Sequence, residues 1–507
     1  MLIPPTRKRF WLARAVRRLW SLEVADALCV VVIAIGAMGV VWGILHRSFD
    51  YDELEHFHAA WLVRRGLKPF YDFFECHPPF FWYPMSVLFR IFGDSYNLLF
   101  VFRFVSALGQ IAFLVGVAKN VALSLRNLPT PVPLPARAAG LAIAFVVLHP
   151  AVAEYLFEFR IDSWPNAILM IAIYRYRRRS QGAFRSSVEL AALSMAAVLC
   201  SPKLIIFAGV FSVASVITDD RRLVRVGGML AGGAGMLALG AGLLRLAGLN
   251  PIHVYRLSLF FHHTLNTKGG FDHGLAEVVW GHTIARNILI ASVIAWPLVA
   301  WRRLHRASFE IAVLVFLALQ LRLVSFPYKQ YYAPWYILAV VFLPYLEVLF
   351  RRVKPLHSLL IAVAFLYAGS NAHELYRGQE DRSEAAQGIK SRKEIEALVP
   401  RDGWIAGAIE QMPSFRRNVF YTLINSFAPN GYGTARIMQD LKLDPFSKEF
   451  TDEIHRRDIE ARRPDLIVLG AAFTPMQRKA VSAYIEKHES EYTRQSGPFG
   501  EMLVRKR

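Results

Sequence analysis

Long apolar runs separated by short polar segments fill roughly the first 370 residues of the chain. Several runs are short, and together they predict about eleven membrane-spanning helices, because about 20 apolar residues cross a bilayer. The runs cover residues 25–46, 96–118, 137–153, 162–176, 187–201, 203–218, 224–247, 284–301, 307–324, 331–349 and 356–372. With 54% hydrophobic residues among 507, the composition also favours a multi-spanning α-helical membrane protein.

Basic residues fall into alternate loops, which predicts an orientation. With the N-terminus inside, every inner loop carries a cluster of Lys and Arg, whereas the outer loops carry scattered single bases. This distribution follows the positive-inside rule. It places residues 49–95 and everything after about residue 373 outside the cytoplasm. The basic segment 1–24 suits an anionic leaflet, so the net charge of +20 indicates topology, and we expect no nucleic-acid partner.

The first predicted exterior loop has an unusual concentration of acids for so basic a chain: Asp50, Asp52, Glu53 and Glu55. Apolar and aromatic positions then recur at helical spacing, which predicts a short amphipathic helix that ends near Gly66. A second helix is expected at residues 80–92. Both are too short to cross a bilayer, and both suit helices in the membrane interface, with rings buried and acids in water.

A change of character after residue 373 predicts a second domain. Short strand-like segments at residues 404–409, 466–471 and 501–506 alternate with helical stretches at residues 383–398, 434–442, 450–463 and 475–489. About 130 residues suffice for one independent fold. We therefore expect a transmembrane domain at residues 1–373 and a small exterior α/β domain at residues 374–507. The latter shows no glycine motif that would cradle a nucleotide phosphate.

The blocks D-x-D-E (50–53), G-x-x-P-F-Y-D-F-F (66–74) and H-P-P (77–79) resemble, in order and spacing, the first exterior loop of the GT-C glycosyltransferases. These multi-spanning enzymes use polyprenyl-phosphate sugars and include aminoarabinose transferases of lipid A and protein O-mannosyltransferases. The resemblance implies an inverting sugar transfer in a bacterial inner membrane. The implied acceptor is lipid A, lipopolysaccharide or another envelope glycolipid, or a protein hydroxyl.

The resemblance also implies which acids act. An acceptor hydroxyl needs a base, and the acid of the family's first loop aligns with the pair Asp52–Glu53, with Asp50 as a third choice. A second exterior motif matches Arg160 and Asp162. There Asp162 would orient the sugar or assist the base, and Arg160 would contact phosphate. The alternatives are acids that only complement a helix dipole and an Arg–Asp pair at a helix start.

For the departing phosphate we expect two lysines, Lys203 and Lys329, at outer ends of predicted spans, where the family has similar lysines. Tyr332 could donate a hydrogen bond there, although an interfacial aromatic belt explains a single tyrosine equally well. His56 and His77 could position the acceptor or tune the base, or could belong to a solvated helix surface.

No resident cofactor is expected. The three cysteines lie far apart, and the histidines of the loop 249–283 lack a metal-ligand spacing on one helical face. Some GT-C enzymes use a divalent cation, so a cation is left open. The rival functions are a multi-spanning transporter, which would place its ionisable residues at mid-membrane, and a catalytically silent scaffold.

Overall fold

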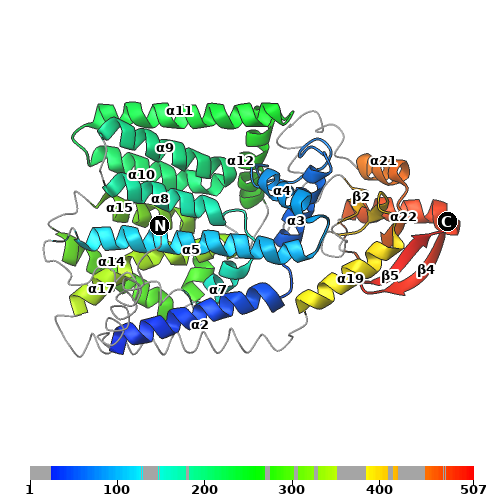
Figure 1. The fold of residues 1–507 in the computed structure, drawn as a ribbon, viewed down its shortest axis with the longest axis horizontal. Coiled ribbons are helices and arrows are strands. Elements are labelled where there is room, and N and C mark those ends of the chain that lie inside the picture. The colour runs from blue at the N-terminus through cyan, green and yellow to red at the C-terminus, as the bar shows by residue number, and fades with distance from the viewer. Residues whose placement is uncertain are drawn as a thin grey trace, which may run out of the picture.

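Helices that run along one long axis build most of the molecule, and a smaller body with a β-sheet lies at one end of them (Figure 1). This computed structural model describes most of the chain. The described residues are 24–126, 128, 147, 149–178, 182–268, 274–281, 283–301, 307–324, 329–350, 384–408, 415–420, 452–471, 473 and 475–506.

Nine of the eleven predicted spans coincide with helices. These are α2 (Val24–His46), α5 (Asn97–Arg126), α8 (Ser163–Arg178), α9 (Ala183–Cys200), η1 (Pro202–Leu204) with α10 (Ile205–Ile217), α11 (Arg222–Leu246), α14 (Thr283–Ala300), α15 (Ser308–Leu323), and α16 (Lys329–Ala339) with η3 (Val340–Phe342) and α17 (Leu343–Phe350). The predicted runs at residues 137–153 and 356–372 lie largely or wholly outside the described residues.

Within the described residues, four helices are long and apolar enough to cross a membrane, and two bent helix pairs raise that number to six. Two further predicted spans, α8 and α15, have only 16 residues each, which is short for a 30 Å hydrocarbon core. The helical membrane architecture is therefore confirmed, and the count of eleven spans stays a prediction.

The outermost helix, α11, shows how the bundle packs in a lipid environment (Figure 1). Its residues Gly228 and Gly232 face α9 so closely that a Cβ at Gly232 would lie 2.2 Å from the carbonyl oxygen of Val188. On its other side Leu223 is 88% exposed and Leu230 is 68% exposed. Small residues toward a neighbouring helix and large apolar ones outward are the pattern of a helix that faces lipid.

Helices α3 (Tyr51–Arg64), α4 (Trp82–Phe92) and α12 (Pro251–Lys268) lie toward the end of the bundle that adjoins the sheet (Figure 1). The bundle also contains the short helices α7 (Pro150–Phe157) and α13 (Leu275–Gly281). The prediction of helices in the first exterior loop is confirmed. The expected acids in water are wrong for Glu53 and Glu55, which are 0% and 2% exposed, because neighbouring helices cover α3 almost all round.

The C-terminal residues form a five-stranded sheet in the order β2-β1-β3-β5-β4. Strands β1, β2 and β3 are parallel, β5 is antiparallel to β3, and β4 is antiparallel to β5. The strands are β1 (Trp404–Ala406), β2 (Arg417–Asn418), β3 (Leu466–Val468), β4 (Tyr492–Gly497) and β5 (Gly500–Arg505). The helices of this C-terminal region are α19 (Glu384–Leu398), α21 (Asp452–Arg462), α22 (Pro475–His488) and η4 (Glu489–Glu491).

Three of these strands match the strand-like segments of the sequence. Strand β4 was not predicted because its sequence YTRQSG is polar and half of its residues are exposed at the sheet edge. The sheet and its helices share a hydrophobic core of their own, around Ile405, Ile467 and Tyr484. The predicted helix at residues 434–442 and the predicted boundary near residue 373 lie outside the described residues.

Candidate functional site

Helix α3 begins just after the C-terminal end of α2, and its N-cap and first turn carry Asp50, Asp52 and Glu53. Asp50 is the N-cap residue, and its backbone N–H donates to the Glu53 carboxylate at 2.8 Å. This contact is half of a capping box, which fixes where the helix starts. Asp52 and Glu53 are adjacent in sequence, but Asp52 contacts Arg160 and Glu53 contacts Arg103.

The Glu53 carboxylate accepts four hydrogen bonds from within the protein. Both of its oxygens accept from the Arg103 guanidinium, at 2.8 and 2.6 Å, and it also accepts from the backbone N–H groups of Phe159 and Asp50, both at 2.8 Å. The Glu53 and Arg103 side chains are both 0% exposed. A carboxylate with four donors and no solvent contact suits a structural ion pair, so the geometry favours Asp52 over Glu53 as the base.

Arg103 also closes the end of α2. Its guanidinium donates to four backbone carbonyls at and just beyond the end of that helix, at 2.6–3.2 Å: Gly43, Ile44, Arg47 and Ser48. One buried cation on α5 thus ties the end of α2 to the start of α3. This explains how a 61° bend between the two helices is held in place.

Arg160 has different surroundings. It lies between α7 and α8, is 4% exposed, and contacts three carboxylates. It donates to Asp50 at 2.9 Å, to Glu158 at 2.9 Å and to Asp52. The Asp52 and Asp50 side chains remain 33% and 41% exposed, so the group opens to the outside. Since three acids already occupy Arg160, a phosphate would have to displace one, and the geometry favours a role for Arg160 in orienting Asp52.

The charges around Arg160 separate the two aspartates. Burial has the largest single effect on the pKa of Asp52 and acts to raise it, but the neighbouring positive charges, Arg160 first and Lys203 among the others, together hold the pKa below its ordinary value. Burial raises the pKa of Asp50 to about 6 against the opposing effect of Arg160. Asp52 is therefore ionised at neutral pH and able to accept a proton, which a general base requires.

Lys203 and Asp162 complete this group. Lys203 follows α9 in η1, and its Nζ lies 4.7 Å from the centre of the Tyr331 ring. Its charge interacts electrostatically with Asp162 and Asp52. Asp162 is 3% exposed, and its Oδ1 has no hydrogen-bond partner among the described residues. Segments more than 150 residues apart in sequence thus bring together Asp52, Arg160, Asp162 and Lys203.

The other predicted phosphate-binding residues are placed less closely. Lys329 is the first residue of α16, and its side chain lies outside the described part of the chain. Tyr332 is half-buried and packs against the hydrophobic core of the helical bundle. The roles predicted for both residues stay predictions.

The two predicted histidines lie in a buried cluster with Glu75, an acid that the sequence analysis did not select. The rings of His56 and His77 are 5.1 Å apart, and Glu75 accepts the backbone N–H of His77 at 2.8 Å and also contacts its Nδ1. One ligand atom from each of the three lies within 4.8 Å of the others, so they could hold a divalent cation. Burial lowers the pKa of His56 to about 4 and that of His77 to about 3, which leaves neutral rings.

Glu75 itself carries a raised pKa of about 7, caused first by burial. The available signal was the sequence E-C-H (75–77) in the same loop as His56, since residues two apart on an extended segment face one way. Among the described residues, the group that could hold a metal does not include the histidines of α12. The expectation of no resident cofactor is therefore untested.

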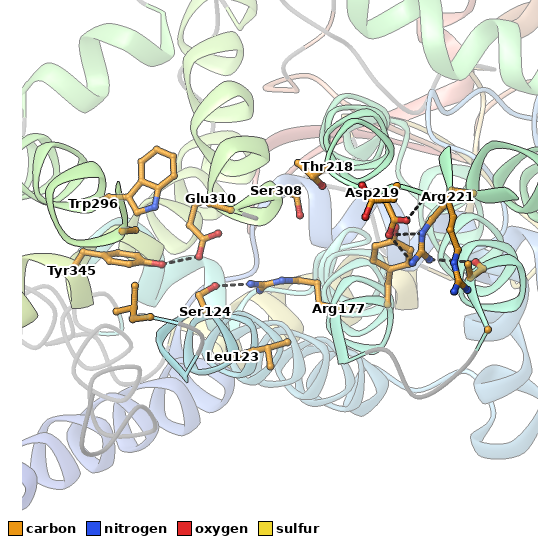
Figure 2. A pocket seen from close by; sticks show the side chains of 18 residues that line it. Leu123, Ser124, Arg177, Thr218, Asp219, Arg221, Trp296, Ser308, Glu310 and Tyr345 are labelled. Atoms are coloured by element: carbon orange, nitrogen blue, oxygen red, sulfur yellow. Dashed lines mark hydrogen bonds and ion pairs between the residues drawn. The ribbon is translucent and has the colours of Figure 1, made fainter. Parts of the chain in front are cut away.

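A separate pocket of about 690 Å³ is lined by side chains that include Ser124, Arg177 and Glu310 (Figure 2). Ser124 on its wall is 27 residues along α5 from Asn97, or about 40 Å. Its charges are largely matched: Arg225 pairs with Asp219 at 2.9 Å, and Glu310 accepts from Tyr345 at 2.8 Å. Since predicted inner loops border this pocket, we do not assign the transfer chemistry to it.

Comparisons with known proteins give structural neighbours only. No protein-family model matches the chain, and no curated protein matches it in sequence. The crystal structure of apo ArnT from Cupriavidus metallidurans is similar with a TM-score of 0.54 and 13% identity, over 95% of this chain and 98% of that one. ArnT from the same organism bound to undecaprenyl phosphate gives 0.51 and 15%, over 77% and 85%.

The chain has the fold of ArnT. This confirms the resemblance to GT-C enzymes at the level of architecture, and it extends that resemblance from short motifs to nearly the whole chain. At 13–15% identity the likeness to ArnT shows the fold alone. What the chain does with that fold has to be argued from its own residues.

Proposed function

We propose that this protein is an integral-membrane glycosyltransferase that moves a sugar from a polyprenyl-phosphate donor to an envelope acceptor at the exterior face. The observation that carries this proposal is the open group of charges around Asp52. An ionised, partly exposed carboxylate is held by Arg160 and lies within electrostatic reach of Lys203, at the end of a bundle with the ArnT fold. The ArnT structure bound to undecaprenyl phosphate supports the choice of donor.

The chemistry follows from the charges. Asp52 removes the proton of the acceptor hydroxyl as that oxygen attacks the anomeric carbon. The bond from this carbon to the phosphate oxygen breaks, and the released polyprenyl phosphate gains negative charge. Lys203 stabilises that charge because it is in place before the charge develops. One displacement inverts the anomeric centre and forms no covalent enzyme intermediate.

Asp162 lies between these two roles. Its unpartnered, buried Oδ1 is an acceptor without a donor, which is costly unless a ligand supplies one. A sugar hydroxyl would satisfy it, so we assign Asp162 to orienting the transferred sugar. For the acceptor we propose lipid A or another lipopolysaccharide component first, and a protein hydroxyl second. The protein would then work in a bacterial inner membrane, with residues 49–95 and the C-terminal domain on the exterior side.

The direct test is transfer from radiolabelled polyprenyl-phosphate sugars by the purified protein in lipid nanodiscs, with wild type compared to Asp52→Asn. Removal of a general base lowers turnover by about 10²- to 10⁴-fold. The matched control is Asp72→Asn, another acid of the same loop, whose exposed carboxylate accepts the backbone N–H of Lys68. Comparable turnover by wild type and Asp52→Asn rejects the base, and no transfer by wild type from any donor rejects the proposed activity.

A further inference from the structure

The C-terminal domain inserts an aromatic residue into the core of the first exterior loop. Phe415 is 4% exposed and belongs to the hydrophobic cluster of α3 and α4, not to the core of its own sheet. Its ring centre lies 4.7 Å from that of Tyr96, 5.8 Å from Phe57, 6.1 Å from Phe89 and 6.2 Å from Trp61. Such a buried aromatic cluster gives strong and geometrically specific packing.

Polar contacts surround this insertion. Arg65, just after α3, donates to Asp402 of the C-terminal domain at 2.6 Å, and Arg401 lies 3.6 Å from Asp94 beside α4. At the start of α3, the backbone N–H of Ser48 donates to Glu384 of α19 at 3.1 Å. Exposed pairs of this kind contribute little energy but fix the orientation of the contact. The C-terminal domain therefore touches α3 near both of its ends.

The position of Phe415 matters because of what α3 carries. Phe57 and Trp61, which Phe415 contacts, follow Asp52 on the same helix by about 7.5 and 13.5 Å along its axis. The first turn of α3 is held by Arg103, which binds Glu53, and by Arg160, which binds Asp52. A helix behaves as a rigid rod over two or three turns, so a change in the packing of its second half alters the placement of its first turn.

We propose that the exterior domain acts on the transfer reaction by positioning α3, and that Phe415 is the residue through which it does so. Phe415 touches neither substrate nor reacting atoms in this account. It holds Asp52 at the place from which that carboxylate reaches the acceptor hydroxyl. The inference rests on the proposed function for its catalytic consequence, whereas the docking of the domain on α3 can be tested without any sugar donor.

The first experiment compares hydrogen–deuterium exchange of residues 51–64 in the full-length wild type and in Phe415→Ala. We expect faster exchange of α3 in the variant, because truncation leaves a cavity beside Phe57 and Trp61. The matched control is Phe499→Ala, which removes a half-buried ring that packs on the sheet's own core. Unchanged exchange in folded Phe415→Ala would overturn the proposal.

The second experiment measures donor kinetics of the same variants. Misplacement of a catalytic group by about 1 Å costs on the order of 100-fold in rate, so Phe415→Ala should lower kcat by about 10- to 100-fold with KM for the donor unchanged. Phe415→Leu should restore most of the rate, because it refills the cavity. A loss confined to the yield of folded protein, with kcat per folded molecule unchanged, would contradict positioning.

A third variant guards against a protein that fails to fold. Asp402→Asn removes the ion pair with Arg65 at a side chain that is 71% exposed, so folding is unaffected. We expect a smaller change of α3 exchange and kcat in the same direction, and no change in either would count against the proposal. If wild type transfers no sugar at all, the proposed function fails, and the exchange comparison still decides whether the domain orders α3.

Discussion

Two buried arginines, Arg103 and Arg160, both contact the first turn of α3, yet their surroundings differ in kind. Arg103 contacts one acid, the buried Glu53, and four backbone carbonyls at the bend between α2 and α3. Arg160 meets three acids, two of which stay open to the outside. The first centre is balanced and closed, whereas the second carries surplus negative charge next to Lys203.

The α3 acids that the two arginines contact all lie within residues 50–53, yet Arg103 holds the fold together and Arg160 lies at the proposed reaction site. A closed, balanced ion pair stabilises one geometry and has nothing left with which to act on a ligand. An open group with surplus acid leaves one carboxylate able to change partners during a reaction. The following experiments are ordered from the largest expected effect to the smallest, and each would sharpen or break this contrast.

The largest effect should follow removal of Arg103. The variant Arg103→Met leaves Glu53 charged, buried and without its counterion, which costs about 3–5 kcal/mol. We expect a large loss of folded, monodisperse protein and a lower melting temperature. Arg126→Met is the control, since that arginine is exposed at the far end of the same helix. If Arg103→Met were as stable as its control, the closed centre would not be structural.

Lys203→Met should weaken the use of donor more than it weakens the fold. Loss of a charge-assisted contact to phosphate costs about 1.5–3 kcal/mol, which is on the order of 10- to 100-fold in affinity. Titration of the protein with polyprenyl phosphate measures this directly. Lys68→Met replaces an exposed lysine just after α3 and should bind as wild type does. Equal affinity of both variants would remove Lys203 from the phosphate site.

A lesion in the bundle gives a purely structural reference for both centres. Gly232→Ala forces a Cβ to within 2.2 Å of the Val188 carbonyl oxygen, and such overpacking costs about 1–3 kcal/mol. Gly235→Ala on the same helix meets nothing within 4 Å. Thermal unfolding should separate the two variants, while turnover per folded molecule stays the same in both. A selective loss of turnover in Gly232→Ala would show that structural damage alone can imitate a catalytic effect.

The smallest effect concerns pH. Because burial raises the pKa of Asp50 from its ordinary 3.8 to about 6, the contribution of Asp50 to stability is full at low pH and is lost as pH rises through about 6. Asp50→Asn keeps a good N-cap but cannot ionise. The melting temperature of the variant minus that of wild type should therefore increase between about pH 4 and pH 7. A constant difference would contradict the crowding of acids around Arg160.

The helical architecture could be predicted from the sequence, but which of the adjacent acids Asp52 and Glu53 forms the buried ion pair with Arg103 could not. Apolar runs and loop charges identify helices because burial in lipid acts on each segment separately, and the same holds for strands such as Leu466–Val468. Asp52 and Glu53 are adjacent and chemically alike, so no local pattern distinguishes them. Arg103 decides between them from 50 residues away, and that contact exists only after α5 has packed against α3.

Other parts of the site depended on distant contacts in the same way. The gathering of Asp52 with Lys203 was predicted through the family resemblance, which encodes a tertiary arrangement that single-sequence patterns lack. Glu75 lay in an aromatic-rich segment where burial of an acid has no periodic signature. The sequence also did not indicate that Phe415 contacts α3. An aromatic residue in this region would be expected to pack in the core of its own domain.

The most direct test of the account sets Asp52→Asn beside Glu53→Gln, with turnover per folded molecule and melting temperature measured for both. We predict that Asp52→Asn lowers turnover by about 10²- to 10⁴-fold while unfolding close to the wild-type temperature. Glu53→Gln should instead unfold at a clearly lower temperature and keep near-normal turnover in the fraction that folds. Full turnover by Asp52→Asn, or a selective loss of turnover in a stable Glu53→Gln, would contradict the assignment.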